Sequence, residues 1–218
     1  MSGMRTFTAV AALAAAIALP GAANATTWMI GDDDGYGAGI PDNGDHPPFV
    51  PTYDGRSAAE MAATDGAEYT DTYSTAHPGY SPQAGTTATF TFSGLGSGWT
   101  AGAMTFDLAD FQADTFGAFL VTYNGIVQNW AFNDGYPHTK IHNFNFAQDV
   151  IDSINTLGSL TIVIDRNGSG DFYGVDYAKL SDVFVADVPE PTTWAMMIGG
   201  FALVGSAMRR RRMVPATA

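Results

Sequence analysis

Polar and apolar residues alternate along most of the chain beyond residue 86. In "TTATFTF" (residues 86–92) the alternation is regular, and it runs less cleanly through "WTAGAMTFDL" (residues 99–108). A period of two places apolar side chains on one face of an extended strand, so these stretches are predicted to be half-buried strands. Further strands are expected at residues 141–146, 159–166 and 171–185.

A β-hairpin is predicted in "GAFLVTYNGIVQNWAF" (residues 117–132). Two apolar runs flank Asn124 and Gly125. A type I′ turn needs positive φ at both central residues, which Asn and Gly tolerate. Because Asn, Gly and Asp turns also separate the other strands, the pattern indicates an all-β fold, an antiparallel β-sandwich resembling a jelly roll.

Two stretches favour helix instead. Residues 55–64 are rich in alanine, and Ser57 and Glu60 have the spacing of a capping box. Residues 147–158 are expected to form one or two turns. The sandwich is therefore predicted to carry one or two short helices, in a single body spanning residues 26–188.

The first 25 residues have the features of a cleavable signal peptide. Arg5 precedes an apolar stretch at residues 7–19, and the small residues Ala23 and Ala25 follow a Pro-Gly break. Signal peptidase is expected to cut after Ala25. The alternative is an N-terminal membrane anchor, but the stretch is short for a hydrocarbon core of about 30 Å.

A second apolar segment lies near the C-terminus, at residues 192–208, and a basic end at residues 209–212 follows it. A helix over the 15 residues from Trp194 to Met208 is about 22 Å long at about 1.5 Å per residue, which is short for a permanent span. The arginines would hold the C-terminus on the cytoplasmic side, so that the body lies outside the cytoplasm.

The order of elements in this tail resembles the PEP-CTERM protein-sorting signal, in its PEPxxWA variant. Residues 189–212 contain the motif and residues 213–218 follow as a short tail; its elements are Pro189, Glu190, Pro191, Trp194, Arg209, Arg210, Arg211 and Arg212. The resemblance implies a precursor held transiently in the inner membrane, recognition by exosortase, and cleavage near the Pro-Glu-Pro. A plain short tail anchor is the alternative.

Charge and cysteine content narrow the functions of the body. Residues 26–188 contain four basic and 21 acidic residues, a net charge of −17. This surface excludes nucleic-acid binding and favours cations. The chain has no cysteine, which excludes disulfides and cysteine nucleophiles.

An acidic loop is the strongest candidate for a metal site. The segment "GDDDGYGAGIPDNGD" (residues 31–45) holds five aspartates and five glycines. Asp-rich and Gly-rich loops supply the oxygen ligands and flexibility that Ca²⁺ prefers. The segment partly resembles the calcium loops of thrombospondin type 3 repeats, and the strand pattern resembles carbohydrate-binding jelly rolls, which often hold calcium between their first and last strands. We expect Asp32, Asp34 and Asp176 as ligands; a solvated acidic loop is the alternative.

Aromatic residues are the other candidates for binding. A flat ring suits the C–H face of a sugar, and Tyr36 and Tyr136 lie in glycine-rich turns where they are expected at the surface. Trp130, within a predicted strand, is expected in the core. His138 and His142 would share one face of a strand, but no third ligand is near in sequence, so a zinc site is not expected.

These features predict an exported cell-surface or extracellular-matrix protein without catalytic residues, associated with exopolysaccharide or biofilm through carbohydrate binding. The alternative is a secreted hydrolase acting on polysaccharide. The body lacks a G-x-S-x-G elbow and has only two glutamates, Glu60 and Glu68, although aspartates for a carboxylate pair are plentiful. Ice binding is disfavoured because the body lacks a regular threonine ladder.

Overall fold

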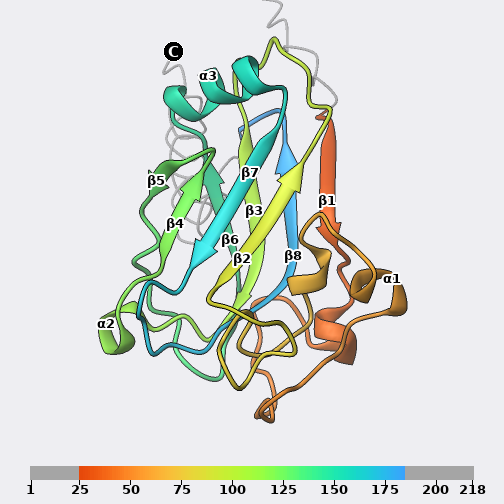
Figure 1. Cartoon of the computed structure of the whole chain (residues 1–218), viewed down its shortest axis with the longest axis vertical. Coiled ribbons are helices and arrows are strands. Elements are labelled where there is room, and N and C mark those ends of the chain that lie inside the picture. The colour runs from red at the N-terminus through yellow and green to blue at the C-terminus, as the bar shows by residue number, and fades with distance from the viewer. Residues whose placement is uncertain (1–24, 185–218) are drawn as a thin grey trace, which may run out of the picture.

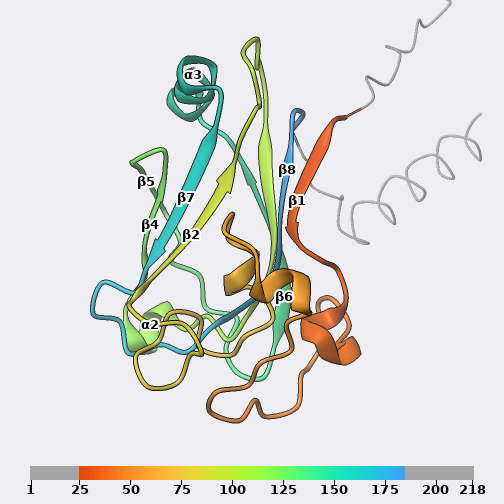
Figure 2. The ribbon, with the colours of Figure 1, turned by 45° about the vertical axis from the view of Figure 1, so that its right-hand side comes forward.

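Eight strands form two antiparallel sheets that pack face to face (Figures 1 and 2). The structure is a computed structural model, and it describes residues 25–184. One sheet has the order β1-β8-β3-β6, formed by Thr27–Gly31, Gly174–Ser181, Ala103–Ala109 and Thr139–Asn145. The second has the order β2-β7-β4-β5, formed by Thr87–Phe92, Leu160–Asp165, Leu120–Tyr123 and Ile126–Gln128. The predicted β-sandwich is confirmed.

The strand order is that of a jelly roll. β1 pairs with β8, β2 with β7, β3 with β6 and β4 with β5. The chain therefore folds back on itself at the turn between β4 and β5. The four strand pairs then alternate between the sheets: β1–β8 and β3–β6 lie in one sheet, and β2–β7 and β4–β5 lie in the other. Asn124 and Gly125 form this central turn, with φ of 49° and 81°. The predicted hairpin is confirmed, although its second strand ends at Gln128.

The core lies between the inner faces of the sheets. Along β2, buried residues alternate with half-buried ones, as they do along β7. Trp130 is 2% exposed and stacks on Phe144 at 5.0 Å between ring centroids, while Phe106 meets it edge-on at 5.0 Å. Trp130 is therefore a core residue, as predicted.

The helices depart from expectation in length and number. α1 (Ala58–Met61) begins with the predicted capping box between Ser57 and Glu60. α3 (Gln148–Leu157) has ten residues, longer than the one or two turns expected. Its buried residues recur with helical spacing, and Gly158 ends it in the left-handed conformation at φ 65°. A third helix, α2 (Ala113–Phe116), and the single turns η1 (Gly35–Gly39) and η2 (Ala67–Tyr69) were not predicted.

Two predicted strands are shorter than expected. β3 begins at Ala103 and not at residue 99, because the N–H groups of Gly98 and Trp99 donate to the Asn155 side chain instead of to a strand. β8 covers Gly174–Ser181 of the predicted 171–185. Both changes leave the order of strands intact.

The connections divide the sandwich into two ends (Figures 1 and 2). β1 starts and β8 finishes at the end that carries α3. The longer connections gather at the opposite end, here called the loop end: residues 32–86, 110–119, 129–138 and 166–173. Apart from Ala25, the predicted site residues within the described part of the chain lie at or near the loop end.

The predicted signal peptide, apart from Ala25, lies outside the described residues, as do the sorting motif and the apolar segment 192–208. Within residues 25–184, no helix has the length and apolar character needed to cross a membrane.

Candidate functional site

A chain of carboxylates runs along the loop end, beside the outer face of β8. Three groups of carboxylates each have oxygens within 4.8 Å of one another. These groups are Asp34, Asp71 and Asp176; Asp32, Glu60 and Asp71; and Asp33, Asp42 and Asp176. Asp71 and Asp176 each belong to two groups and so link the chain together.

Asp71 is fully enclosed, as is Asp176. It is 0% exposed, neither carboxylate oxygen accepts a hydrogen bond from an N–H or hydroxyl group, and the neighbours close enough to share a proton with it are the carboxyls of Asp176 and Glu60. Its backbone is fixed on both sides, because its N–H donates to the carbonyl of Val175 at 2.8 Å and its carbonyl accepts from the N–H of Gly55, also at 2.8 Å. The backbone itself has φ 52°. The β8 strand therefore holds this carboxylate in place, inside the protein and without a donor.

Asp176 is held by the turn that follows β1. Its carboxylate accepts the N–H of Tyr36 at 2.8 Å and that of Gly35 at 3.3 Å. Asp34, which precedes the same turn, accepts the N–H of Gly37 at 2.6 Å. The turn η1 thus orients two of the three carboxylates of one group.

Burial and mutual repulsion perturb the acids strongly. Burial, followed by the neighbouring Asp176 and Glu60 carboxyls, raises the pKa of Asp71 to about 10. Burial, followed by the negative charges of Asp176 and Asp42, raises the pKa of Asp107 to about 8. The pKa of Asp176 rises to about 6, because burial outweighs the backbone donors. Neutralisation by a proton or by a cation would relieve this repulsion.

The structure brings two of the three predicted metal ligands together. Asp34 and Asp176 share a group with Asp71, whereas Asp32 lies in the adjacent group with Glu60 and Asp71. Asp71 was not predicted, because an isolated aspartate in "YTDTYS" gives no signal in the sequence. Only the course of residues 50–85 across β8 places it there.

The prediction for Tyr36 is wrong. Its side chain is 1% exposed and packs with Ile40, Phe49 and Ala109 against the outer face of the first sheet. Its φ is 61°, and the turn packs tightly against the following connection, because a Cβ on Gly37 would clash with the carbonyl oxygen of Gly55. A ring in this position is not available to a ligand.

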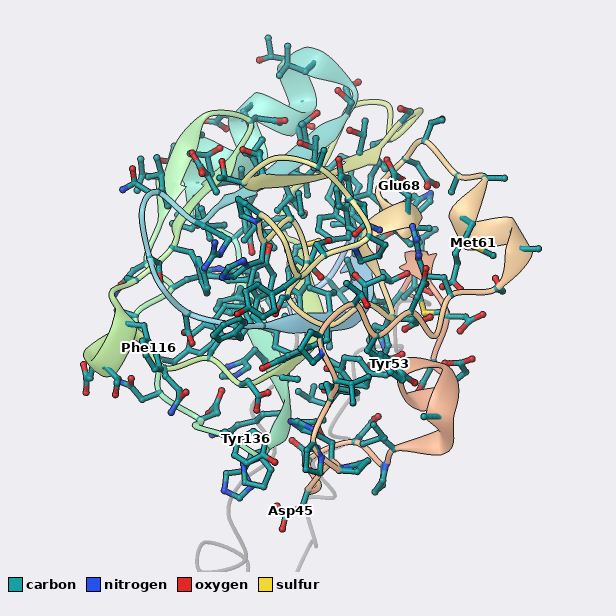
Figure 3. All side chains as sticks on the ribbon, turned by 60° about the horizontal axis from the view of Figure 1, so that its bottom comes forward. Asp45, Tyr53, Met61, Glu68, Phe116 and Tyr136 are labelled. Atoms are coloured by element: carbon teal, nitrogen blue, oxygen red, sulfur yellow. The ribbon has the colours of Figure 1, made fainter. Side chains whose placement is uncertain are left out.

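Tyr136 is exposed, as predicted. Its side chain is 51% exposed and projects from the loop end near Asp45 (Figure 3). Its ring meets the buried ring of His46 edge-on at 5.6 Å. His46 is in turn anchored, because its Nε2 lies 2.8 Å from Asp110.

A cavity of about 330 Å³ opens at the loop end, and residues on both sides of Tyr136 in the sequence line it. Apart from Gly44, its lining residues carry polar side chains: Asn43, Asn133, Asp134, His138, Thr139 and Lys140. Several of these side chains are held in position. Asp134 contacts Lys140 at 3.2 Å and His142 at 2.5 Å, and His138 contacts Asp45 at 2.6 Å. His138 and His142, which were expected on one face of a strand, therefore pair with different aspartates, Asp45 and Asp134.

A second cavity, of about 520 Å³, lies at the opposite end of the sandwich. Trp28 and Trp99 stack there with ring centroids 5.4 Å apart, and Asp182 and Val183 complete the wall. This cavity is lined by residues near both ends of the described part of the chain, Thr26 and Val183.

Residues 187–212 match the family described as the PEP-CTERM protein-sorting motif. The chain carries a PEP-CTERM sorting signal. The match covers the predicted sorting residues from Pro189 to Arg212. No curated protein and no solved structure matches the chain. The PEP-CTERM motif makes this an exported protein that passes through the membrane and is processed by exosortase.

Proposed function

We propose that this PEP-CTERM protein is a non-enzymatic, polysaccharide-binding component of the cell surface or extracellular matrix, and that it binds glycan at the loop end. The observation that carries the proposal is an exposed ring, Tyr136, which lies in the chain between Asp134 and His138, two residues that line a cavity with mostly polar side chains. Association with exopolysaccharide or biofilm follows from export together with this site.

The two parts of the site suit the two faces of a sugar. An exposed tyrosine ring offers a flat apolar face for the C–H groups of a pyranose. The amides of Asn43 and Asn133, and the charged groups of Asp134 and Lys140, offer donors and acceptors for hydroxyls. Because Asp134 is held by Lys140 and His142, less conformational entropy is lost on binding.

The location of the site supports the proposal. The sorting motif begins at residue 187, shortly after β8 finishes at the α3 end. Tyr136 lies at the opposite end of the sandwich (Figures 1 and 3). A protein delivered through its C-terminal segment would present the loop end away from the membrane.

The charge of the body indicates the class of glycan. The predicted body carries a net charge of −17, which repels anionic polymers at low ionic strength. Neutral polysaccharides are therefore the expected ligands, and binding should change little with salt.

Substitution of Tyr136 tests the site. Tyr136→Ala is expected to weaken binding to a neutral polysaccharide about three- to tenfold, because the stacking surface is lost. The measurement is retention of the purified protein on immobilised glycans. Phe116→Ala is the matched control, since it removes another ring, 41% exposed, from the same end. The proposal would be contradicted if the unaltered protein and both variants were retained equally. It would also be contradicted if the unaltered protein were retained no more strongly than a control protein of equal net charge.

The same samples distinguish binding from hydrolysis. A glycoside hydrolase needs two carboxyl groups about 5–10 Å apart across the sugar. Among the described residues that line the polar cavity, Asp134 is the one carboxylate, and it is already paired. We therefore expect no new reducing ends after incubation; their appearance would favour the hydrolase.

A further inference from the structure

The carboxylate of Asp71, like that of Asp107, is buried without an N–H or hydroxyl donor for either oxygen. Its neighbours in the groups around it are the carboxylates of Asp34, Asp176, Asp32 and Glu60. A buried carboxylate without a donor costs several kcal/mol in effective terms, so such groups are ordinarily paired or bound to a metal.

No basic side chain of the described residues compensates this charge. Each is engaged elsewhere. Arg56 pairs with Asp54, and Lys140 with Asp134. Arg166 donates to the carbonyl of Asp171, and Lys179 lies over the Tyr177 ring.

We propose that Asp71, Asp34 and Asp176 bind a Ca²⁺ ion at the loop end. This site does not depend on the proposed glycan site, which uses other residues. The ion would join three segments that are distant in sequence: the turn after β1, the 50–85 connection and β8.

The geometry of the three carboxylates suits Ca²⁺. One oxygen from each lies within 4.8 Å of the others. Two oxygens bound to one Ca²⁺ at about 2.3–2.6 Å are separated by at most about 4.6–5.2 Å, so the three oxygens can reach one ion, and flexible carboxylate ligands without a fixed octahedral geometry suit Ca²⁺. An all-oxygen donor set also excludes a preference for zinc, which favours nitrogen and sulfur.

The turn η1 leaves the ligands free to bind. The N–H groups of Gly35 and Tyr36 hold Asp176, and the N–H of Gly37 holds Asp34. A carboxylate has about four acceptor positions, so each of these aspartates keeps lone pairs for a cation. The backbone donors therefore orient the carboxylates without saturating them.

Glu60 is a weaker candidate for the same ion, although it also lies near Asp71. One of its oxygens accepts from the N–H of Ser57 at 2.8 Å, and the other from the hydroxyl of Thr70 at 3.0 Å. Its charge is thus already partly compensated. Asp71 belongs to one group with Asp34 and to another with Glu60. Substituting Asp34 and Glu60 separately therefore shows which of the two groups binds the ion.

Titration of the exported protein, as purified from its host and freed of metal by EDTA, tests the proposal. The probe is Ca²⁺ alone, followed by calorimetry and thermal unfolding. At about one hundred times Kd, a bound ion should raise Tm by about 5–10 °C, and EDTA should reverse the shift. No heat and no shift at millimolar Ca²⁺ would overturn the proposal, and an equal affinity for Mg²⁺ would overturn the choice of ion.

Variants locate the ion. Asp71→Asn should abolish the Ca²⁺-induced shift, and Asp34→Asn, at an exposed position, should weaken binding at least about tenfold through loss of one charge. Glu60→Gln preserves the capping box and should change Kd less than about threefold. Asp114→Asn, which removes an exposed charge from α2, is the control and should bind as the unaltered protein does. Loss of binding in Glu60→Gln but not in Asp34→Asn would overturn the assignment of ligands.

Discussion

Asp107 shows how much a single residue can cost this fold. It lies in β3, has no exposed surface and has no hydrogen-bond partner for either oxygen. The charges of Asp176, Asp42 and Asp33 add to the effect of burial. Such a group is accommodated most easily in its neutral form, so its protonation is coupled to folding.

This coupling predicts a dependence of stability on pH. An aspartate in an unfolded chain has a pKa of about 3.9, whereas burial raises the pKa of Asp107 in the folded protein to about 8. Between these values the folded state retains a proton that the unfolded state has released. The free energy of unfolding, measured in EDTA, should therefore fall as the pH rises from about 4 to 8, by a few kcal/mol in order of magnitude.

Asp107→Asn isolates the contribution of this residue. The amide cannot ionise, so the variant should be more stable than the unaltered protein at pH 8 and should lose less stability between pH 5 and pH 8. A smaller slope should remain. The raised pKa values of Asp71 and Asp176 contribute to it in the same direction. Although burial alone would lower the pKa of His46, its hydrogen bond to Asp110 raises it overall, so its stabilisation is also lost as pH rises. Identical slopes in denaturant titrations of the two proteins would contradict this explanation.

Residue-level prediction from the sequence succeeded where the pattern is local and failed where distant segments meet. Asp34, from the Asp-rich loop, and Asp176, from the last strand, were expected to lie close together, and they do; that they bind a metal stays a prediction. The sequence "GYG" suggested an exposed Tyr36, but the flanking glycines let the turn pack on β3 and bury the ring. Asp71 could not be predicted, because its surroundings depend on tertiary contacts alone.

Among the elements, the β4–β5 hairpin has a central role, because the chain doubles back there to form the jelly roll. Asn124 also joins the hairpin to β7. Its side chain donates to the carbonyl of Ser159 at 3.0 Å and accepts from the N–H of Thr161 at 2.8 Å. The turn therefore contributes both backbone conformation and side-chain hydrogen bonds.

Gly125→Ala tests the backbone contribution. The φ of Gly125 is 81°, and a Cβ there would meet no atom within 4 Å, so any cost arises from conformation alone. We expect a loss of about 1–2 kcal/mol in the free energy of unfolding. Gly170→Ala is the control, because its φ is not in the left-handed region and the nearest atom would lie at 3.8 Å. Its effect should stay within about 0.5 kcal/mol, and equal losses in both variants would contradict the conformational explanation.

The strands could largely be predicted from alternation because each half-buried strand shows its period locally. The β1–β8 and β3–β6 pairings could not, since residues far apart in the chain form them. Strand ends also shifted where side chains replaced ladder partners, as Asn155 does for Trp99. The buried face of α3, at Val150, Ile151 and Ile154, shows why that helix is longer than the sequence suggested.

At the scale of the whole molecule, the two ends of the described chain and the proposed binding site lie at opposite ends of the sandwich (Figure 1). The body begins and finishes at the α3 end, where the N–H of Thr26 donates to Asp182 at 2.8 Å and the N–H of Asp182 donates to the carbonyl of Thr26 at 3.2 Å. The acidic cluster and Tyr136 lie at the loop end (Figures 1 and 3). In the proposed function, this arrangement keeps the proposed sites away from the end at which the described chain starts and stops.

Mass spectrometry of the mature protein, isolated from cells that possess exosortase, tests the central claim most directly. The expected product begins at Thr26 and has a new C-terminus between Pro189 and Thr192, because the segment from Trp194 to Arg212 is read as a signal and removed. The same protein made in cells without exosortase is the control and should keep Arg212. A mature product that retains Arg212 in the presence of exosortase would contradict the account.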